Sequence, residues 1–209
     1  MKCLMILLLL ISFATAQKDT ITLQHKFYAT TFDTVKRYPV LVQWWITKTM
    51  LDCPIRLKRK VANFKPDPLL PQYTDLKQSY KGRGYDQGHN MDAYDNECDL
   101  TGLLECSYFS NVTAQTARLN RGDWKALEEY NRRAVLNNDS IYVWCGSLGA
   151  KEKIGEVTVP TICWKVLFIK KTGKYEAFAF ANDTTKPRGI DAHRVSCDSI
   201  FKLTGFKIK

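Results

Sequence analysis

One histidine of the sequence stands in a setting that suits proton transfer. His89 closes the tetrapeptide Asp86-Gln87-Gly88-His89, and the glycine before it permits a close approach of the backbone. An imidazole can act as a general base near neutral pH when a neighbour fixes its ring. A lone histidine can equally be a structural or solvated residue of a turn, and the tetrapeptide alone leaves both interpretations open.

A second set of polar residues follows at the start of a predicted helix. Residues 122–135 carry apolar side chains at helical spacing, with charged residues between them. Asn120 before them is either an N-cap or a carbonyl ligand for Mg²⁺, which needs only one or two protein oxygens beside water and phosphate. Glu128 and Arg132 are four residues apart on one helix face. They form either a surface ion pair or part of the same site.

The charge of the chain favours a polyanionic partner. Its 209 residues include 31 Lys and Arg against 21 Asp and Glu, a net charge of +10. Nucleic acid, an anionic membrane and acidic glycans are the partners that such a surplus attracts. No repeat or linker divides the sequence, and its length suits one domain with a sizeable core.

Residues 1–16 predict a secretory signal peptide. A positive start and an almost wholly apolar run at residues 4–13 precede Ala-Thr-Ala at residues 14–16, a pattern that signal peptidase accepts. The run is too short to span a bilayer as a stable helix. We therefore expect a mature domain of residues 17–209 that is secreted, extracellular or periplasmic, with no membrane segment.

The cysteines predict disulfides. Six of the seven follow the predicted signal: Cys53, Cys98, Cys106, Cys145, Cys163 and Cys197. An even number in an exported chain indicates three disulfides, and the sequence leaves their pairing open. A zinc site is the alternative, but no Cys-x-x-Cys pair exists and the three histidines lie far apart.

Strand and helix patterns are mixed without strict alternation, which predicts an α+β fold. The predicted strands are residues 141–145, 161–169 and 175–181. They are expected to form an antiparallel sheet in which the last two make a hairpin. Residues 199–203 predict a short helix that Gly205 stops, and residues 56–81, rich in Lys and Pro, predict mostly loop.

Together these segments resemble the DNA/RNA non-specific endonuclease family, which includes secreted bacterial nucleases and mitochondrial endonuclease G. The family motif D-R-G-H resembles the tetrapeptide that ends at His89. The family segment S-N-x-x-P-Q-x-x-x-x-N-x-G-x-W-x-x-L-E resembles residues 110–128. Its matching residues are Ser110, Asn111, Gln115, Asn120, Gly122, Trp124, Leu127 and Glu128. A V-P-T-x-x-W-K-V stretch at residues 159–166 and other similarities extend the resemblance over residues 40–208.

The resemblance implies a fold and a reaction. The family fold is a His-Me finger (ββα-metal), a β-hairpin and a helix around a metal ion, set on a central antiparallel sheet flanked by helices. The reaction is Mg²⁺-dependent hydrolysis of phosphodiester bonds in DNA and RNA with little sequence preference, with Mn²⁺ as a substitute cation. Contacts confined to phosphate would explain the indifference to base and sugar.

The same resemblance implies roles for single residues. His89 resembles the general base that activates water, and Asn120 resembles the single direct protein ligand of Mg²⁺. Glu128 resembles the carboxylate that holds a water on the metal, and Arg132 the arginine that stabilises charge on the scissile phosphate. Asp86 is expected to shape the motif and to support the histidine loop.

Two positions depart from the family pattern. Gln87 replaces the arginine of D-R-G-H, so a charged catalytic donor becomes a neutral one. The family's upstream catalytic arginine has Lys36 and Arg37 as its nearest candidates, and Arg83 could compensate. Arg83 and Arg121 are also candidates for substrate binding. These departures keep a second function open, a secreted nucleic-acid-binding relative with weak or no catalysis. A basic secreted toxin or glycan-binding protein in which the motifs are accidental is the remaining alternative.

Overall fold

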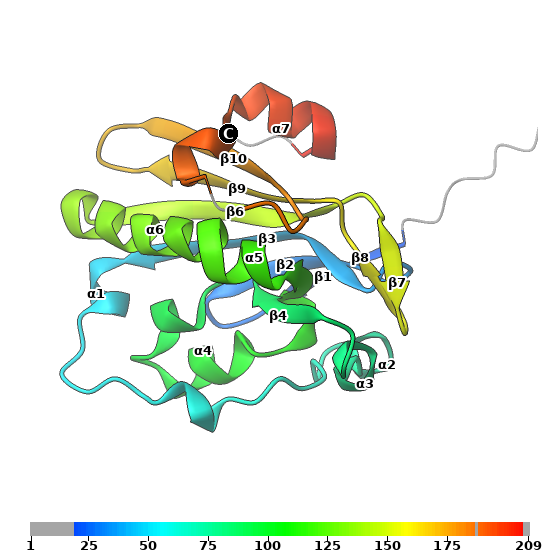
Figure 1. The fold of residues 1–209 in the computed structure, drawn as a ribbon. Coiled ribbons are helices and arrows are strands. Elements are labelled where there is room, and N and C mark those ends of the chain that lie inside the picture. The colour runs from blue at the N-terminus through cyan, green and yellow to red at the C-terminus, as the bar shows by residue number, and fades with distance from the viewer. Residues whose placement is uncertain (1–18, 187, 207–209) are drawn as a thin grey trace, which may run out of the picture.

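A seven-stranded antiparallel sheet in the order β1-β2-β3-β6-β9-β10-β11 forms the centre of the molecule (Figure 1). The computed structural model describes residues 19–186 and 188–206. The strands of the sheet are β1 (Thr20–Gln24), β2 (Tyr28–Asp33), β3 (Tyr38–Thr47), β6 (Ser140–Leu148), β9 (Ile162–Ile169), β10 (Lys174–Ala181) and β11 (Arg194–Val195). Each neighbouring pair is antiparallel. The expected α+β architecture is confirmed.

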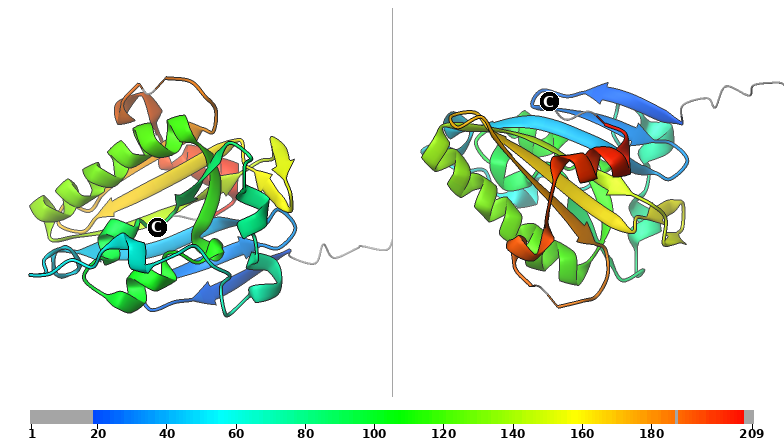
Figure 2. Two further views of the ribbon diagram at one scale, coloured as in Figure 1. Left: turned by 60° about the horizontal axis from the view of Figure 1, so that its bottom comes forward. Right: turned by 90° about the horizontal axis from the view of Figure 1, so that it is seen from above.

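The two faces of this sheet carry different layers. Helix α6 (Lys125–Asn138) covers one face, here called the inner face, and α7 (Cys197–Thr204) crosses the outer face (Figure 2). Successive side chains of a strand point to opposite faces. On β6, Ile141 and Val143 are therefore buried in the core beneath α6, whereas Tyr142 between them points to the outer face.

A second, two-stranded sheet lies on the inner side of the molecule. Strand β4 (Tyr85–His89) pairs antiparallel with β5 (Val112–Thr116). The chain then runs through α5 (Ala117–Leu119) and the helical segment η4 (Asn120–Trp124) directly into α6. Two strands and one helix are thus brought together as the family fold requires (Figure 1).

Shorter elements connect these layers. They are α1 (Lys48–Leu51), α2 (Pro71–Thr74), α3 (Lys77–Tyr80), α4 (Leu100–Glu105), the helical turns η1 (Arg59–Val61), η2 (Ala93–Asn96), η3 (Phe109–Asn111) and η5 (Ile190–His193), and the strands β7 (Glu152–Ile154) and β8 (Val157–Val159). Residues 56–81 contain η1, α2 and α3 and are otherwise loop, as expected from their composition.

The elements predicted in the second half of the chain are confirmed with shifted ends. Strands β9 and β10 form the expected hairpin, and β6 continues past Gly146 to Leu148. Helix α7 ends at Gly205, whose φ of +74° suits a glycine at this position. The long helix begins later than predicted, because the backbone of Gly122 is not helical. Strands β1, β2 and β3 have no counterpart in the sequence prediction.

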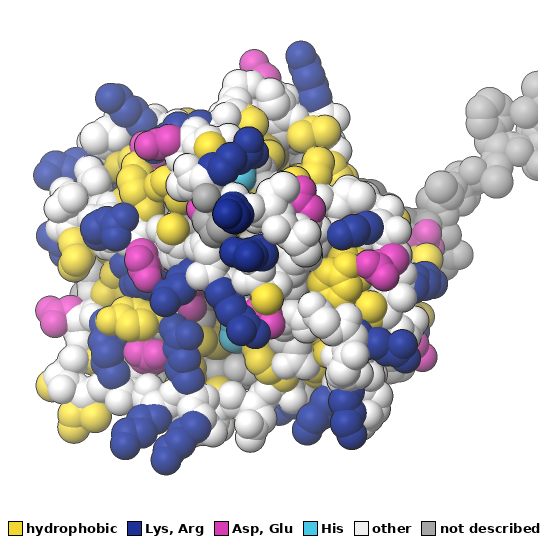
Figure 3. All heavy atoms as spheres, in the orientation of Figure 1, with side chains coloured by type: hydrophobic (Ala, Val, Ile, Leu, Met, Phe, Trp, Pro, Cys, Tyr) yellow, Lys and Arg dark blue, Asp and Glu magenta, His cyan; other side chains and the backbone are white. Residues whose placement is uncertain are grey.

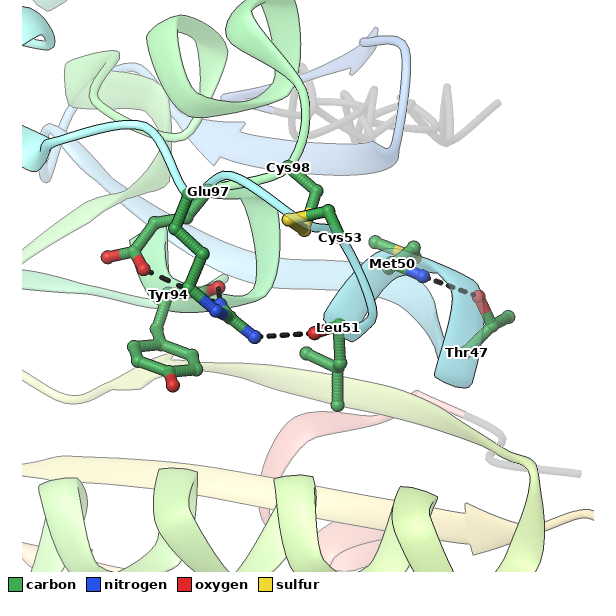
Figure 4. Close-up of a disulfide and its surroundings, with 8 residues drawn as sticks. Thr47, Met50, Leu51, Cys53, Tyr94, Glu97 and Cys98 are labelled. Carbon is green, nitrogen blue, oxygen red and sulfur yellow. Dashed lines mark hydrogen bonds and ion pairs between the residues drawn. A yellow bond between two sulfur atoms is a disulfide. The ribbon is translucent and has the colours of Figure 1, made fainter.

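One disulfide, Cys53–Cys98, joins the loop after α1 to the loop before α4 (Figure 4). The prediction of three disulfides is therefore wrong. Within the part of the chain that the structure describes, the free cysteines are Cys106, Cys145, Cys163 and Cys197. Cys145 and Cys163 belong to the core on the inner face, where burial raises the pKa of each thiol to about 12. They serve as small apolar side chains, a common role of buried cysteine.

The predicted signal peptide, residues 1–16, lies outside the described residues. The mature boundary at residue 17 therefore stays a prediction. Within residues 19–186 and 188–206, no helix combines the length and the apolar character needed to cross a membrane.

Candidate active site

His89 is the last residue of β4, and close packing against β5 holds it in place. It is paired in register with Val112. Gly88 before it leaves no room for a side chain, because a Cβ there would lie 2.2 Å from Oε1 of Gln115. The close approach expected at this glycine is present, and it places His89 at the end of a strand rather than in a turn.

Phe64 lies beside the imidazole of His89, and Trp124 holds its backbone. The ring centroid of Phe64 lies 4.8 Å from that of His89, and Nε1 of Trp124 donates to the carbonyl oxygen of His89 at 3.0 Å. Its Nε2 is buried and has no hydrogen-bond partner among the described residues. Burial lowers the pKa of His89 to about 4, an effect that Asp92 opposes and Arg59 reinforces. The ring is therefore uncharged at neutral pH, the form that can accept a proton.

Asn120 is held by a carboxylate of the histidine motif. Its amide nitrogen donates to Asp86 at 2.9 Å, which leaves the amide oxygen for another partner. Arg121 donates to both oxygens of Asp86, at 2.8 and 2.7 Å, and these hydrogen bonds keep the pKa of Asp86 below its usual value. The N-cap interpretation of Asn120 is wrong, because Thr116 caps the helix by accepting from the N–H of Leu119.

The sequence-predicted residues meet at one pocket of about 420 Å³. Its wall consists of Arg59, Gln87, His89, Asp92, Asn120, Arg121, Lys125, Glu128 and Arg132. Six of the eight predicted site residues are thus on one wall. Of the other two, Asp86 lies behind the wall and holds Asn120, whereas Arg83 is exposed in the turn before β4 and does not line the pocket.

Glu128 and Arg132 do not pair with each other as a surface ion pair. Arg132 contacts the carboxylate of Asp92 and lies 3.6 Å from that of Asp95. Glu128 shares the pocket with them, and its burial together with the charge of Asp92 raises its pKa well above the usual value. The two residues therefore belong to a partly buried cluster of acidic and basic groups at the base of the pocket.

A buried lysine supplies positive charge behind this cluster. Lys165 of β9 is only 1% exposed, and its Nζ lies 4.2 Å from the ring centre of Trp124. Its charge acts against the rise in the pKa of both Glu128 and Asp95. The carboxylates of the pocket therefore have cations on two sides, Arg132 and Lys165.

Arg59 has no place among the sequence predictions, yet it lines the pocket. Its Nε lies 3.0 Å from Glu97 and one terminal nitrogen lies 3.4 Å from Asp92. Lys36 and Arg37, the nearest candidates for an upstream arginine, instead lie at the turn between β2 and β3 and pair with other carboxylates. In the sequence, Arg59 is marked only by the basic run at residues 56–60. That run lies in a loop, where no helical or strand periodicity indicates which side chain faces the pocket.

A second hollow, of about 680 Å³, adjoins the pocket at Gln87. It is lined by Lys77, Gln78, Tyr80, Lys81, Tyr85, Asp86 and Gln87. Lys and Arg side chains are numerous on the face that carries α5 and α6 (Figure 3). The two hollows and the charge around them suit an extended polyanion.

The donor atoms at the pocket suit a hard cation. Among the described residues, no group of three or more His, Cys, Asp or Glu side chains is placed to hold a metal ion. The amide oxygen of Asn120 and the carboxylate of Glu128 are oxygen donors on the same wall. Mg²⁺ is commonly held by one or two protein oxygens, with water and substrate phosphate completing its shell. The residues present therefore fit Mg²⁺ better than zinc, which prefers several nitrogen or sulfur ligands.

Comparison with known proteins decides the family. The sequence pattern of the DNA/RNA non-specific endonucleases matches residues 9–209. The chain belongs to this family. It is therefore one of a family of enzymes that hydrolyse phosphodiester bonds.

Individual members of the endonuclease family are distant in sequence. The chain is 29% identical to the mitochondrial nuclease EXOG of Xenopus laevis, over 87% of this chain and 56% of that protein. It is 29% identical to the nuclease of Serratia marcescens, over 93% of this chain and 77% of that protein. It is 28% identical to the mitochondrial endonuclease G of Homo sapiens, over 62% of this chain and 49% of that protein. The chain thus spans about half the length of the two mitochondrial relatives.

The fold of the family is also found in solved structures. A chain in the crystal structure of the EndoG/EndoGI complex, which describes the mechanism of EndoG inhibition, matches with a TM-score of 0.81. The match has 23% sequence identity and covers 90% of this chain and 84% of that one. The expected fold is confirmed by this likeness.

Proposed function

We propose that this endonuclease-family protein cleaves the phosphodiester bonds of both DNA and RNA with little sequence preference, using Mg²⁺. In the proposal His89 is the general base and Asn120 is the metal ligand. One observation carries it. His89 lines the same pocket as Asn120, whose amide nitrogen is already bound to Asp86, so that its amide oxygen is left for a cation beside the imidazole.

His89 accepts the proton of the attacking water. Its low pKa keeps the ring uncharged across the neutral range, and strand β4 together with the hydrogen bond from Trp124 fixes its position. A general base has to be within hydrogen-bond reach of the proton that it takes. The pocket beside it has room for a water molecule and a phosphate group.

Arginines on the same wall stabilise the phosphate. Asp92 holds Arg132, and Glu97 holds Arg59, so both guanidinium groups are positioned before substrate arrives. Donors fixed in advance stabilise the charge that grows on the phosphate oxygens during the reaction. Because such contacts reach the phosphate and not the base, they select neither sequence nor sugar.

The amide oxygen of Asn120 is the proposed protein ligand of the cation. Asp86 accepts a hydrogen bond from the amide nitrogen, and this contact turns the oxygen away from Asp86. When bound, Mg²⁺ supplies Lewis-acid stabilisation of the phosphate and of the leaving oxygen. Glu128 faces the same space and adds a second oxygen-bearing group. Mn²⁺ accepts similar oxygen ligands and is expected to substitute.

We further propose that the protein is secreted after removal of residues 1–16. The support is the apolar run and the Ala-Thr-Ala pattern that follows it. The disulfide Cys53–Cys98 favours an oxidising compartment. Mass spectrometry of protein exported by the producing cell tests this proposal, with Gln17 expected as the first residue.

The nuclease proposal is tested by digestion of plasmid DNA and of RNA, each with Mg²⁺, with Mn²⁺ and with EDTA. Cleavage of both substrates with either cation, and none with EDTA, is expected. The His89→Ala variant is the matched control for a contaminating nuclease, since it is purified in the same way.

The neutral Gln87 beside the base favours a second candidate, a nucleic-acid-binding protein with weak catalysis. If purified protein binds both nucleic acids but cleaves neither with either cation, this second function replaces the first.

A further inference from the structure

The outer face of the large sheet, opposite the pocket, carries a row of aromatic side chains. Trp45 of β3, Tyr142 of β6, Phe168 of β9 and Tyr175 of β10 are successive cross-strand partners in register. Trp144 lies two residues after Tyr142 and therefore on the same face. These five residues are called the aromatic row.

The rings of the aromatic row contact one another and remain partly open to solvent. Ring centroids are 4.9 Å apart for Trp45 and Tyr142, 4.5 Å for Tyr142 and Trp144, and 4.8 Å for Phe168 and Tyr175. Trp45 is 41% exposed and Tyr175 is 40% exposed. The five rings and Gln43 line a shallow hollow of about 390 Å³. Aromatic residues rarely gather at an exposed surface unless it binds a partner.

Helix α7 covers the neighbouring part of this face, and Trp144 at the edge of the row packs partly buried against the core cluster to which α7 contributes. Ile200 of α7 packs on Trp164 and Val166, which form the adjacent core cluster. The view from above shows α7 lying across the sheet, away from the turn between β9 and β10 (Figure 2). The aromatic row is at the end of the sheet near that turn. Trp45 and Tyr175 of the row therefore remain exposed on the part of the face beyond α7.

Lysines surround the exposed end of the row. Lys170, Lys171 and Lys174 are exposed in and beside the turn between β9 and β10, and none of them forms an ion pair with a described residue. The Nζ of Lys170 lies 5.9 Å from the ring centre of Trp45. The surface therefore combines aromatic rings with unpaired positive charge.

We propose that the aromatic row is a binding surface for single-stranded nucleic acid. Bases stack on Trp45 and Tyr175, and the lysines of the turn contact the phosphates. Stacking rings beside cations is the combination by which proteins bind single strands without sequence selection, and open sheets present such rings to unpaired bases in RNA-binding domains. Unpaired positive charge favours this polyanion over an apolar protein partner.

This surface goes beyond the proposed cleavage reaction. Stacking on the outer face requires neither His89 nor a cation, and it acts on a part of the strand remote from the bond being cut. A duplex keeps its bases stacked inside and offers only its phosphates. The row is therefore expected to favour single strands over duplexes, whereas the pocket contacts phosphates in either.

The proposal is tested without digestion by binding an oligothymidylate of twenty nucleotides to the full-length His89→Ala protein in EDTA. The readouts are fluorescence anisotropy of a labelled strand and quenching of tryptophan emission. Trp44, Trp124 and Trp164 are buried, so quenching reports on Trp45 and Trp144. Trp45→Ala is expected to raise the Kd about tenfold, the usual cost of losing one stacked base, and to remove most of the quenching.

A charge-reversal variant, Lys171→Glu with Lys174→Glu, tests the same surface without touching its packing. It is expected to weaken binding by a similar factor and to reduce the salt dependence. The matched control is Phe201→Ala, which removes an aromatic of 40% exposure on α7 and is expected to leave the Kd unchanged. Duplex of equal length should respond to neither the Trp45→Ala nor the Phe201→Ala variant, and less than the single strand to the charge reversal.

Three outcomes would overturn the proposal. One is an unchanged Kd in both the Trp45→Ala and the charge-reversal variant. Another is an equal loss of duplex and single-strand binding in these variants, which would show that the surface contacts phosphates and does not stack bases. The third is sedimentation of the unmodified protein as a dimer that Trp45→Ala converts to a monomer with the same Kd, which would make the row an interface between copies. None of these depends on whether the protein cleaves nucleic acid.

Discussion

His89 and His193 both contact the helical segment η4, but their ring nitrogens have different surroundings. Nε2 of His193 lies 2.8 Å from Asp123 of η4, which also accepts the N–H groups of Arg188 and Gly189 at 2.9 and 3.0 Å. The backbone of His89 is bound by η4 through Trp124, but its Nε2 has no partner. The imidazole of His193 is bound by a carboxylate and fixes a loop, whereas Nε2 of His89, the proposed base, has no such partner among the described residues.

The same contrast extends to the third histidine. His25 is 3.0 Å from Asp67, and both side chains are buried. Although burial opposes ionisation, the contacts from His25 and Ser110 hold the pKa of Asp67 below its usual value. Two of the three histidines thus serve as partners of aspartates. An unpaired imidazole at a charged pocket is the arrangement that points to catalysis.

Exchange of each histidine for alanine gives the largest expected difference. His89→Ala should lower turnover by roughly 10²- to 10⁴-fold, the usual loss when a general base is removed. His193→Ala should change turnover by less than about threefold in protein that remains folded, and should act mainly on stability. Turnover on plasmid DNA, with thermal unfolding of each variant, measures both. Similar losses of turnover in the two variants would end the distinction between the two histidines.

Asp86 and Asp123 offer the next contrast, since one holds the proposed metal ligand and the other holds a loop. Asp86→Asn should lower turnover by roughly 10- to 100-fold at limiting Mg²⁺, because a partner that orients a ligand typically contributes that much. Raised Mg²⁺ should restore part of the loss. Asn120→Ala is the reference variant, which raised Mg²⁺ should restore less. Titration of turnover against Mg²⁺ checks this, and identical Mg²⁺ dependence in Asp86→Asn and the unmodified protein would exclude the orienting role.

For the loop, Asp123→Ala should reduce the free energy of unfolding by about 1–3 kcal/mol, since it leaves three donors without their partner. Burial opposes ionisation of Asp123, but the N–H groups of Arg188 and Gly189 and the ring of His193 lower its pKa in the folded protein. Its contribution is therefore complete above the pKa of the unfolded chain and is lost as the pH falls through the folded value. Denaturant unfolding at several pH values should show the two proteins converging in acid. A constant difference at all pH values would contradict this origin.

The sequence predicts the site best where residues close in the chain are also close in space. Asn120, Glu128 and Arg132 come from the consecutive helical segments η4 and α6, so their spacing carries much of the geometry, and His89 is indicated by the resemblance of its tetrapeptide to a family motif. Arg59 reaches the same pocket from a loop, and no period links a loop residue to a distant strand. The position of such residues depends on tertiary contacts that a single sequence does not display.

The errors in the fold have similar physical causes. The prediction from an even number of cysteines assumes that each forms a disulfide, but Cys145 and Cys163 are buried in the core as free thiols. Strands β1 and β2 are shorter and richer in threonine than β9 and β10, and part of β1 is exposed. Strand β3 takes its place in the sheet by pairing with β6, which lies far along the chain, and β2 and β1 add beside it.

Substitution of Gln87 should produce the smallest change in turnover. It tests whether a missing positive charge beside His89 limits the reaction. Gln87 lines both hollows beside the base, where family members carry arginine. Gln87→Arg should raise turnover several-fold, because a charge-assisted hydrogen bond to phosphate is roughly twice as strong as a neutral one. An added cation also disfavours the protonated imidazole. Since burial and Arg59 already lower the pKa of His89 to about 4, the acid limb of the unmodified enzyme should fall well below pH 6.5.

The Gln87→Arg variant should move that limb lower still, because a lower pKa leaves the base uncharged at a lower pH. Profiles of kcat/KM against pH for the two proteins decide the matter, with Mg²⁺ held saturating in both. Gln87→Asn is the matched control, which shortens the side chain without adding charge and should leave the limb in place. A folded Gln87→Arg protein that is slower at every pH would show that Gln87 supports the packing of β4 and that the missing charge does not limit the reaction. A limb at or above pH 6.5 in the unmodified enzyme would instead show that a group other than the buried His89 must lose its proton before cleavage.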